Sequence, residues 1–518
     1  MPILQEQFGG IAPKISPKKL PPQLAQVAEN CRWQGGKLQP VAGIADVSDV
    51  AGLPLSLYYD QITNVYRSDL TKRSYVRPFL AGDLYQFTYY TDGIKPRIYA
   101  FGDPTYDLGI PRPTMGSITV STHDVSDPLT LVEVSYAVAW VDGYGRLGPL
   151  SDASGIVSVN PDDPAWGVTI PRPTTPPTSW NVGSWRVYRT STGSSSTEFQ
   201  FVGDATFATG VFVDNQSPDA LFEVAESDIW EPLPDTAEGL ILHVSSLFAF
   251  TKNEVYASES FIPHGFPYSW GFQEKVMGLV ALSGGVLVLT DGRPYLLAGS
   301  EAANMQILPL ESSDVCLSKD SIVDFGSTAI YASTNGLIGV SGTNVINLTN
   351  DLFDKESWPQ FNPTSILAFQ YENLYIGVHS GGAFSFDPQT KDFSTLDLDK
   401  IIAWAYNPEA DQVAVLYDLG VDRRLGLFNE GSLLTYTWRS RVEVQPDFKG
   451  YAVVRVEADG YPLTLTVIGD AESDTITIQD REPHRLPVPY VAKNWSFQIE
   501  GTHAVDLIGI FESMGVVV

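Results

Sequence analysis

Apolar and polar residues alternate in short runs between Leu240 and Gly431, and a tight turn joins the two runs of each pair. Alternation with a period of two indicates strands that bury one face. The turn tips are built from Lys, Asn, Asp and Gly: Lys252-Asn253, Asp291-Gly292, Asn335-Gly336 and Gly381-Gly382. Such tips between alternating runs are a strong hairpin signal, so the pattern predicts a succession of β-hairpins.

The hairpins recur at intervals of roughly 40 to 45 residues, the length of one four-stranded propeller blade. A further pair of apolar runs, at 401–418 and 423–431, falls where the next unit is expected. We therefore predict that residues 223–436 form the main blades of a β-propeller. The alternative is a meander of hairpins in two packed sheets, because hairpins alone do not fix their arrangement and no WD or kelch motif occurs.

Composition favours an all-β protein. The 44 Gly and 36 Pro argue against long helices, whereas 25 Phe, 24 Tyr and 11 Trp suit half-buried strands. A chain of 518 residues is long enough for several domains and a large core.

The sequence before the hairpin region indicates two further structural regions. Residues 51–110 hold four short strand-like runs, the size of one more blade, and we expect strands from both ends of the chain to close a ring without exposed edges. Residues 111–222 are richer in Pro, Ser and Thr and predict an immunoglobulin-like or fibronectin-like sandwich inserted between blades. The pentapeptide IPRPT occurs at 110–114 and again at 170–174, which indicates proline-fixed strand edges or linkers.

The two ends of the chain differ from the hairpin region. Residues 437–518 alternate strongly and predict a compact C-terminal β domain, with Trp438 and Trp495 as core aromatics. Residues 1–50 are rich in Gly and Pro, with one helix-like piece at 22–30. Because this segment is too short to build its own core, we predict an arm that lies on another surface and serves in docking.

Charge and targeting signals narrow the classes of function. With 61 acidic and 32 basic residues the formal charge is −29, which disfavours binding to nucleic acid and to anionic membranes. An acidic wall would let DNA pass without sticking, although solubility alone also explains the charge. The N-terminus lacks the pattern of a secretory signal, and the most apolar window, 276–290, is too short and too glycine-rich for a membrane span. We expect a protein made in a cytoplasm.

Candidate chemistry is sparse. Cys31 and Cys316 suggest neither a disulfide framework nor a zinc site. The histidines lack metal-ligand spacing, and each is expected to be a surface or hydrogen-bonding residue: His123, His243, His264, His379, His484 and His503. No nucleophile elbow, P-loop or EF-hand loop occurs. Several carboxylates fit turns or caps better than an acid pair: Asp214, Asp291, Asp351, Asp354 and Glu356. We therefore assign no catalytic, cofactor or metal residue.

The order of several motifs resembles the tail nozzle proteins of short-tailed bacteriophages, also called tail tubular or tail stabilisation proteins. At the N-terminus the matching residues are Phe8, Gly9, Gly10, Leu20, Pro21, Ala25, Ala28, Asn30, Gly36, Leu38 and Pro40. The likeness continues through YASES, GLVALSGGVLVLTDGRPYLLAGS and STNGLIGVSG, and the stretch YAVAWVDGYGRLGPLSDAS followed by WRVYRT is similar to a fibronectin-type insert of phage tail proteins. It closes on Leu486-Pro487, Trp495, Phe497, Gly501 and Glu512.

This resemblance implies a structural virion protein and no enzyme. The expected function is that of a homohexameric nozzle ring that extends the DNA-ejection channel below the tail adaptor ring, next to tail fibre or spike proteins, and helps to retain and release the genome. DNA would pass without specific binding, and the virion tail would be assembled in the host cytoplasm. The alternative is a host-glycan-binding or glycan-degrading propeller of a tail appendage, whose loop aromatics would stack on sugars or else cover a domain interface: Phe261, Phe266, Tyr268 and Trp270.

Overall fold

The computed structural model describes residues 2–77, 84–100, 104–174, 179–192, 197–221, 223–487 and 490–516. Within these ranges the protein is all-β and contains no α-helix. Single-turn 3₁₀ helices are its helical segments: η1 (Pro218–Ala220), η2 (Ala302–Asn304), η3 (Lys319–Ser321), η4 (Trp358–Phe361), η5 (Pro363–Ser365) and η6 (Met514–Val516). The chain divides into two compact units, the first with residues 1–72, 287–296 and 308–518, the second with residues 73–286 and 297–307.

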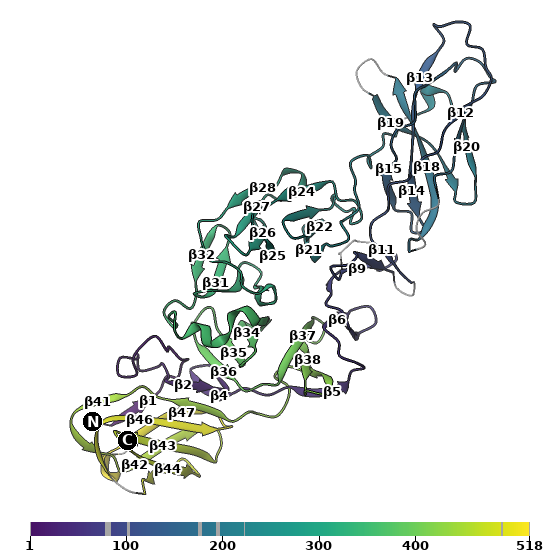
Figure 1. The fold of residues 1–518 in the computed structure, drawn as a ribbon. Helices are drawn as coiled ribbons and strands as arrows, with labels where there is room; N and C mark the ends of the chain where they lie inside the picture. Colours follow the sequence, from purple (N-terminus) through teal and green to yellow (C-terminus); the bar gives the residue numbers. More distant parts are fainter. Residues whose placement is uncertain are drawn as a thin grey trace. The chain divides into compact units, whose positions relative to one another are not determined.

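Antiparallel meanders of four strands recur along the chain, each in sequence order (Figure 1). Their strands are β8 (Ser74–Val76), β9 (Thr88–Thr91), β10 (Arg97–Tyr99) and β11 (Thr105–Asp107); β21 (Glu238–His243), β22 (Ser246–Phe250), β23 (Glu254–Ala257) and β24 (Tyr268–Gly271); β25 (Val276–Leu282), β26 (Gly285–Thr290), β27 (Tyr295–Ala298) and β28 (Gln306–Pro309); β29 (Val323–Asp324), β30 (Ala329–Ser333), β31 (Gly336–Ser341) and β32 (Asn344–Asn347); and β33 (Leu367–Tyr371), β34 (Leu374–His379), β35 (Gly382–Phe386) and β36 (Phe393–Leu396).

The four predicted turn tips occupy equivalent places. Each joins the second and third strands of its meander: β22 to β23, β26 to β27, β30 to β31 and β34 to β35. Two of the glycines, Gly336 and Gly382, begin the third strand with φ of 141° and 145°, a region that favours glycine. The predicted hairpins are therefore confirmed, and their spacing reflects one repeated four-stranded element.

A further four-stranded sheet joins the N-terminal segment to residues 400–427 within the first unit. It runs β37 (Lys400–Asn407), β38 (Gln412–Asp418), β39 (Arg423–Leu427) and β5 (Ala45–Asp49), so its fourth strand comes from the N-terminal segment. Arg424 binds the carboxylates of Asp46 and Asp49 across this pairing. A separate hairpin, β6 (Ser56–Asp60) and β7 (Val65–Asp69), packs its apolar face on β37 and β38. Strands from 51–110 therefore lie in this hairpin and in β8–β11, and residues 78–83 and 101–103 fall outside the described ranges.

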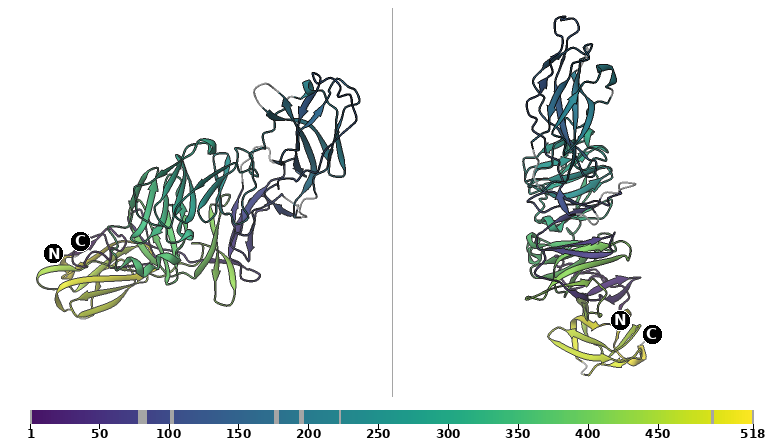
Figure 2. Two further views of the ribbon diagram at one scale, coloured as in Figure 1. Left: turned by 45° about the horizontal axis from the view of Figure 1, so that its top comes forward. Right: turned by 90° about the vertical axis from the view of Figure 1, so that its right-hand side faces the viewer.

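Between β11 and β21, in the second unit, the strands form three sheets whose buried side chains belong to one core. Figure 2 draws this region in dark blue-green. They consist of β12 (Thr119–Val120), β17 (Val168–Pro171) and β20 (Val211–Asp214); β13 (Val132–Val134) and β16 (Val157–Val159); and β15 (Leu147–Leu150), β14 (Tyr136–Asp142), β18 (Val182–Thr192) and β19 (Thr197–Thr206). Trp140 and Trp185 are fully buried in this core. Ile110 and Ile170, which begin the two IPRPT copies, are buried there too, and the Thr174 N–H donates to the Thr114 carbonyl.

Both ends of the chain meet in the C-terminal part of the first unit, where β1 pairs with β47 (Figure 1). One sheet runs β3 (Cys31–Gln34), β4 (Lys37–Pro40), β47 (Val505–Phe511), β42 (Val453–Ala458) and β45 (His484–Arg485), with β1 (Ile3–Gln5) beside β47. The other continues from β36 through β2 (Val27–Glu29), β40 (Tyr436–Arg439), β46 (Val491–Gly501), β43 (Leu463–Gly469) and β44 (Glu472–Ile478), with β41 (Glu443–Gly450) beside β46. Trp438 and Trp495 are buried between them, as predicted.

The helix-like piece predicted at 22–30 is wrong. The segment forms a turn and then β2, whose Glu29 lies beside Thr395 of β36 while Val27 to Glu29 pair with β40. Two unpaired strand edges on either side offer backbone hydrogen bonds that an isolated short helix lacks, so tertiary pairing overrides local propensity. Residues 1–50 thus supply β1 to β5 to sheets of this chain, and their role as a docking arm stays a prediction.

Candidate functional site at the N-terminal junction

The first three residues of the resemblance form one packed contact. The Phe8 ring meets Trp438 edge to face, with 5.1 Å between centroids. The Trp438 Nε1–H donates to the Gly9 carbonyl over 3.0 Å, and the Gly10 N–H donates to the Asp392 carboxylate over 2.8 Å. A Cβ on Gly10 would lie 2.1 Å from the Phe393 nitrogen, so only glycine lets the segment approach β36 this closely.

Other residues of the resemblance extend this contact into a junction. Ala25 and Ala28 are buried, and the Ala25 N–H donates to the Gly10 carbonyl. Asn30 has a φ of 55°, its Nδ2 donates to the Thr435 carbonyl, and its Oδ1 accepts from the Asp397 N–H. One asparagine therefore ties the N-terminal segment to the connections that follow β36 and precede β40.

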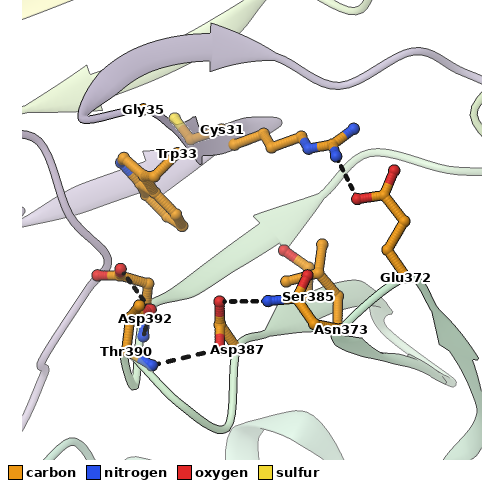
Figure 3. A pocket seen from close by; sticks show the side chains of 11 residues that line it. Cys31, Trp33, Gly35, Glu372, Asn373, Ser385, Asp387, Thr390 and Asp392 are labelled. Carbon is orange, nitrogen blue, oxygen red and sulfur yellow. Dashed lines mark hydrogen bonds and ion pairs between the residues drawn. The ribbon is translucent and has the colours of Figure 1, made fainter.

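A cavity of about 210 Å³ opens beside this junction (Figure 3). Trp33 of β3 lies over it, and the turn between β35 and β36 supplies Asp387, Thr390 and Asp392 to its other side. The Trp33 Nε1 is buried without a hydrogen-bond partner among the described residues. Arg32 forms an ion pair with Glu372 at the rim.

The two aspartates are held by donors of their own chain. Asp387 accepts from the Asn373 amide over 2.9 Å and from the Gln389 N–H over 2.8 Å. Asp392 accepts from the Thr390 hydroxyl over 2.7 Å as well as from Gly10. Burial raises the pKa of Asp392, the Thr390 and Gly10 hydrogen bonds oppose this shift, and the charge of Asp387 adds to it. These hydrogen bonds hold the turn in place and line the cavity with carboxylate oxygens.

The structure gives this cavity little catalytic capacity. Cys31 in its lining is buried, its thiol donates to the Glu29 carbonyl, and burial raises the thiol pKa, which disfavours the reactive thiolate. Across the described residues no group of three or more His, Cys, Asp and Glu is placed to hold a metal ion. Sequence reasoning assigned no site residue here; the only local signal was the Asp-rich turn at 387–392, which is typical of any tight connection.

The histidines singled out in the sequence are dispersed. His264 is buried: its Nε2 lies 2.9 Å from the Leu147 carbonyl oxygen, and its ring meets Trp230 edge to face. Burial, together with the charge of Arg146, lowers the pKa of His264 to about 3, against the opposing hydrogen bond to Leu147. Burial also lowers the pKa of His243 and of His379. These imidazoles are neutral structural groups at neutral pH.

Among the predicted turn carboxylates, Asp354 accepts the N–H groups of Glu356 and Ser357, as a turn residue should. Asp214 differs from the prediction. One of its oxygens accepts from the Gln216 N–H, but the other binds Arg189 over 2.7 Å and the Tyr136 hydroxyl over 2.8 Å inside the core of the inserted sheets. Its role as half of a buried ion pair was invisible in the sequence, because the partners lie in different strands.

The aromatic residues proposed as sugar platforms are mostly engaged in packing. Phe266 is buried, and Trp270 stacks on Phe248 with 6.2 Å between centroids. The Tyr268 hydroxyl donates to Glu259 over 2.7 Å. Phe261 is 65 % exposed. Three of the four side chains therefore have partners that are already internal to the second unit.

Comparisons with known proteins identify distant structural similarity. No protein-family model and no curated protein sequence matches the chain. Solved structures with similarity include Myxococcus xanthus glutaminyl cyclase (12 % identity, TM-score 0.23, 37 % of this chain and 90 % of that one) and the Neurospora crassa Pan2 WD40 domain (9 %, 0.27, 62 % and 89 %). BBS1N in complex with ARL6DN matches at 10 % identity and a TM-score of 0.31, over 76 % of this chain and 99 % of that one. A WD40 domain is thus among the structural matches.

None of the helices in the described ranges has the length and apolarity needed to cross a membrane.

Proposed function

We propose that this chain is a structural virion protein, a subunit of the nozzle ring in the tail of a short-tailed bacteriophage. In this proposal six copies form a ring below the tail adaptor, extend the channel for DNA ejection, and contact tail fibre or spike proteins. The finer fold is a β-propeller with an inserted fibronectin-like sandwich and a C-terminal β domain. A ring of identical subunits needs two different, complementary faces on each copy.

The observation that carries the proposal is the N-terminal junction. Phe8, Gly9, Gly10 and Asn30, which form part of the resemblance to nozzle proteins, all serve to clamp the N-terminal segment to β36 and β40. Residues that match a family by sequence and also meet in one contact are better support than scattered matches, since each depends on the others for its place. Such a junction, which fixes the N-terminal segment to the sheet, suits a subunit that bears mechanical load in the tail.

The charge of the chain supports a passive role toward DNA. A formal charge of −29 repels the phosphate backbone, and this electrostatic term supplies most non-specific binding. In the proposed channel, acidic walls keep the genome from sticking while it is released. The protein would act by shape and charge without a chemical step.

The decisive experiment measures the copy number and position of the chain in purified particles, by quantitative mass spectrometry and by electron microscopy with a labelled antibody. Six copies at the distal end of the tail are expected. A peripheral position with another stoichiometry contradicts the nozzle assignment, and absence from particles contradicts any structural role in the virion.

The second candidate is a host-glycan-binding or glycan-degrading tail appendage, and the cavity below Trp33 favours it. The Trp33 indole and polar side chains such as Asn373 and Thr390 line one cavity (Figure 3), a combination that resembles a saccharide site. This candidate requires host polysaccharide to raise the melting temperature of the protein, with the effect lost in Trp33→Ala and kept in Trp270→Ala. If host polysaccharide does not shift the melting temperature of the wild-type protein and six copies lie at the distal tail, the glycan-binding candidate is rejected and the nozzle function is retained.

A further inference from the structure

A groove of about 560 Å³ lies between two sheet edges of the region inserted between β11 and β21. One wall is the extended segment 112–118, which leads into β12, the terminal strand of the β12-β17-β20 sheet. The other is the segment 152–157, which continues β15, the terminal strand of the β15-β14-β18-β19 sheet, into β16. Both edges belong to the second unit.

Many backbone N–H groups along both walls lack partners within the described residues. On the second wall the N–H of Ser154 donates to the Tyr136 carbonyl over 2.8 Å. Some wall carbonyls are engaged: that of Thr114 accepts from the Thr174 N–H, and those of Asp152, Ser154 and Gly155 accept from serine hydroxyls. Eight amides make no hydrogen bond within the described residues: those of Met115, Gly116, Ser117 and Ile118 on the first wall, and those of Asp152, Ala153, Gly155 and Ile156 on the second. Unpaired N–H groups along a sheet edge are donors with which an added strand can pair.

The groove also has an apolar floor. Met115, Ile118 and Val157 are half-buried and pack on the core that contains Trp140 and Trp185. Ile156 stands at the rim and is 69 % exposed. Backbone donors at the walls and apolar side chains beneath them are the two elements of β-strand addition, in which the backbone supplies affinity and alternate side chains supply specificity.

Charge indicates the chemistry of the occupant. Of the two charged residues in the lining, Arg112 is already committed, because it donates to the Leu150 carbonyl and forms an ion pair with Glu231. Asp152 is exposed and forms no ion pair within the described residues. Residues 111–222 contain eleven acidic and five basic side chains, so the field around the groove is negative and favours a basic partner.

We infer that this groove binds an extended strand of a partner protein, apolar at alternate positions and with a lysine or arginine facing Asp152. The walls are seven and six residues long, and six residues correspond to roughly 20 Å of extended chain. The added strand pairs with one or both edges and covers Met115 and Ile118. The inference concerns this groove alone and does not depend on the proposed function.

The test uses the full chain and a fluorescent eight-residue peptide of alternating valine and threonine with a lysine at each end. We expect half-saturation at or below about 1 mM and slower amide hydrogen exchange in 112–118 and 152–157. The same peptide with alternate N-methylated amides cannot pair as a strand, and its binding should weaken at least about tenfold. A version with glutamate in place of lysine should bind more weakly, and Asp152→Lys should reverse this preference.

Two matched variants separate groove binding from a general effect. Ile156→Lys places a charge at the rim, whereas Ile94→Lys alters an isoleucine of the same exposure, 70 %, in the turn between β9 and β10. Only the first should abolish binding. Equal binding of the N-methylated peptide, no binding by the wild-type chain, or unchanged exchange in both walls overturns the inference. Self-association that Ile156→Lys removes, without peptide binding, overturns it in favour of a second copy as the occupant.

Discussion

Gly10 shows how one missing side chain allows two distant parts of the chain to join. A Cβ at this position would meet the backbone nitrogen of Phe393 at 2.1 Å and its oxygen at 2.6 Å. Backbone atoms of a paired strand cannot rotate away as a flexible side chain can. An added Cβ would therefore push the N-terminal segment away from β36 and weaken the contact between them. His264 and Asp214 are likewise structural residues, because each is buried and bonded to groups of its own unit. The His264 ring contacts the Leu147 carbonyl, and Asp214 pairs with Arg189.

Gly10→Ala should lower the free energy of unfolding of the first unit by about 1 to 3 kcal/mol, the usual cost of overpacking. Chemical denaturation followed by tryptophan fluorescence measures the change. The control is Gly271→Ala, where no heavy atom lies within 4 Å of the added Cβ. Equal stability of the two variants would show that the Gly10 contact is loose.

His264 should make the second unit sensitive to acid. Its pKa in the folded state is about 3, below the ordinary value of 6.5, so the unfolded chain binds more protons between these values. The resulting stability is present above about pH 6.5 and is lost as the pH falls toward 3. His264→Gln should therefore reduce the loss of stability between pH 7 and 4.5 by about 2 kcal/mol. Denaturation at both pH values, with His123→Gln in the same unit as control, checks this. An equal loss of stability in wild type and His264→Gln contradicts it.

At the scale of elements, the N-terminal segment is held by strands that the sequence does not connect locally. β2 bridges β36 and β40, β5 completes the sheet of β37 to β39, and β1 pairs with β47. Pairing strands that are so far apart in the sequence closes long loops, which costs conformational entropy. We therefore expect these strands to pair late in folding and to separate early in unfolding. Trp438 anchors this segment through its ring contact with Phe8 and its hydrogen bond to the Gly9 carbonyl.

Trp438→Phe keeps an aromatic ring but removes the donor to the Gly9 carbonyl. We expect faster hydrogen exchange and faster proteolytic cleavage within residues 8–30, with a cost of about 1 to 2 kcal/mol for the lost hydrogen bond and the cavity. Trp495→Phe is the matched control, because its Nε1 donates to Ala492 within the same strand. Release of residues 8–30 in both variants, or in neither, would contradict an anchor specific to Trp438.

At the scale of the whole molecule, the net negative charge disfavours binding to nucleic acid. Labelled duplex DNA should show no binding to the purified chain at 150 mM salt, and none when the salt is lowered to 50 mM, because a charge of −29 offers no general phosphate-binding surface. Fluorescence anisotropy measures this. Binding that strengthens steeply as salt is lowered would contradict passage of DNA without attachment.

The amino-acid sequence by itself determined the local features. Alternation and turn tips such as Asn335-Gly336 identified the hairpins, because strand faces and turn conformations depend on neighbouring residues. The burial of Trp438 and Trp495 followed in the same way from their place in alternating runs. The motif at Phe8 to Gly10 could be recognised, but its purpose could not be derived from it.

Only the tertiary structure decided which distant segments share a sheet. The pairing of Ala45 with Leu427, the strand at 27–29 in place of a predicted helix, and the cavity beside Asp392 all depend on partners hundreds of residues away. Local propensity contributes tenths of a kcal/mol per residue, whereas an unpaired buried backbone group costs more, so the available edges determine the conformation of such segments. The same reason explains why the groove between 112–118 and 152–157 became visible only once its two edges were placed together.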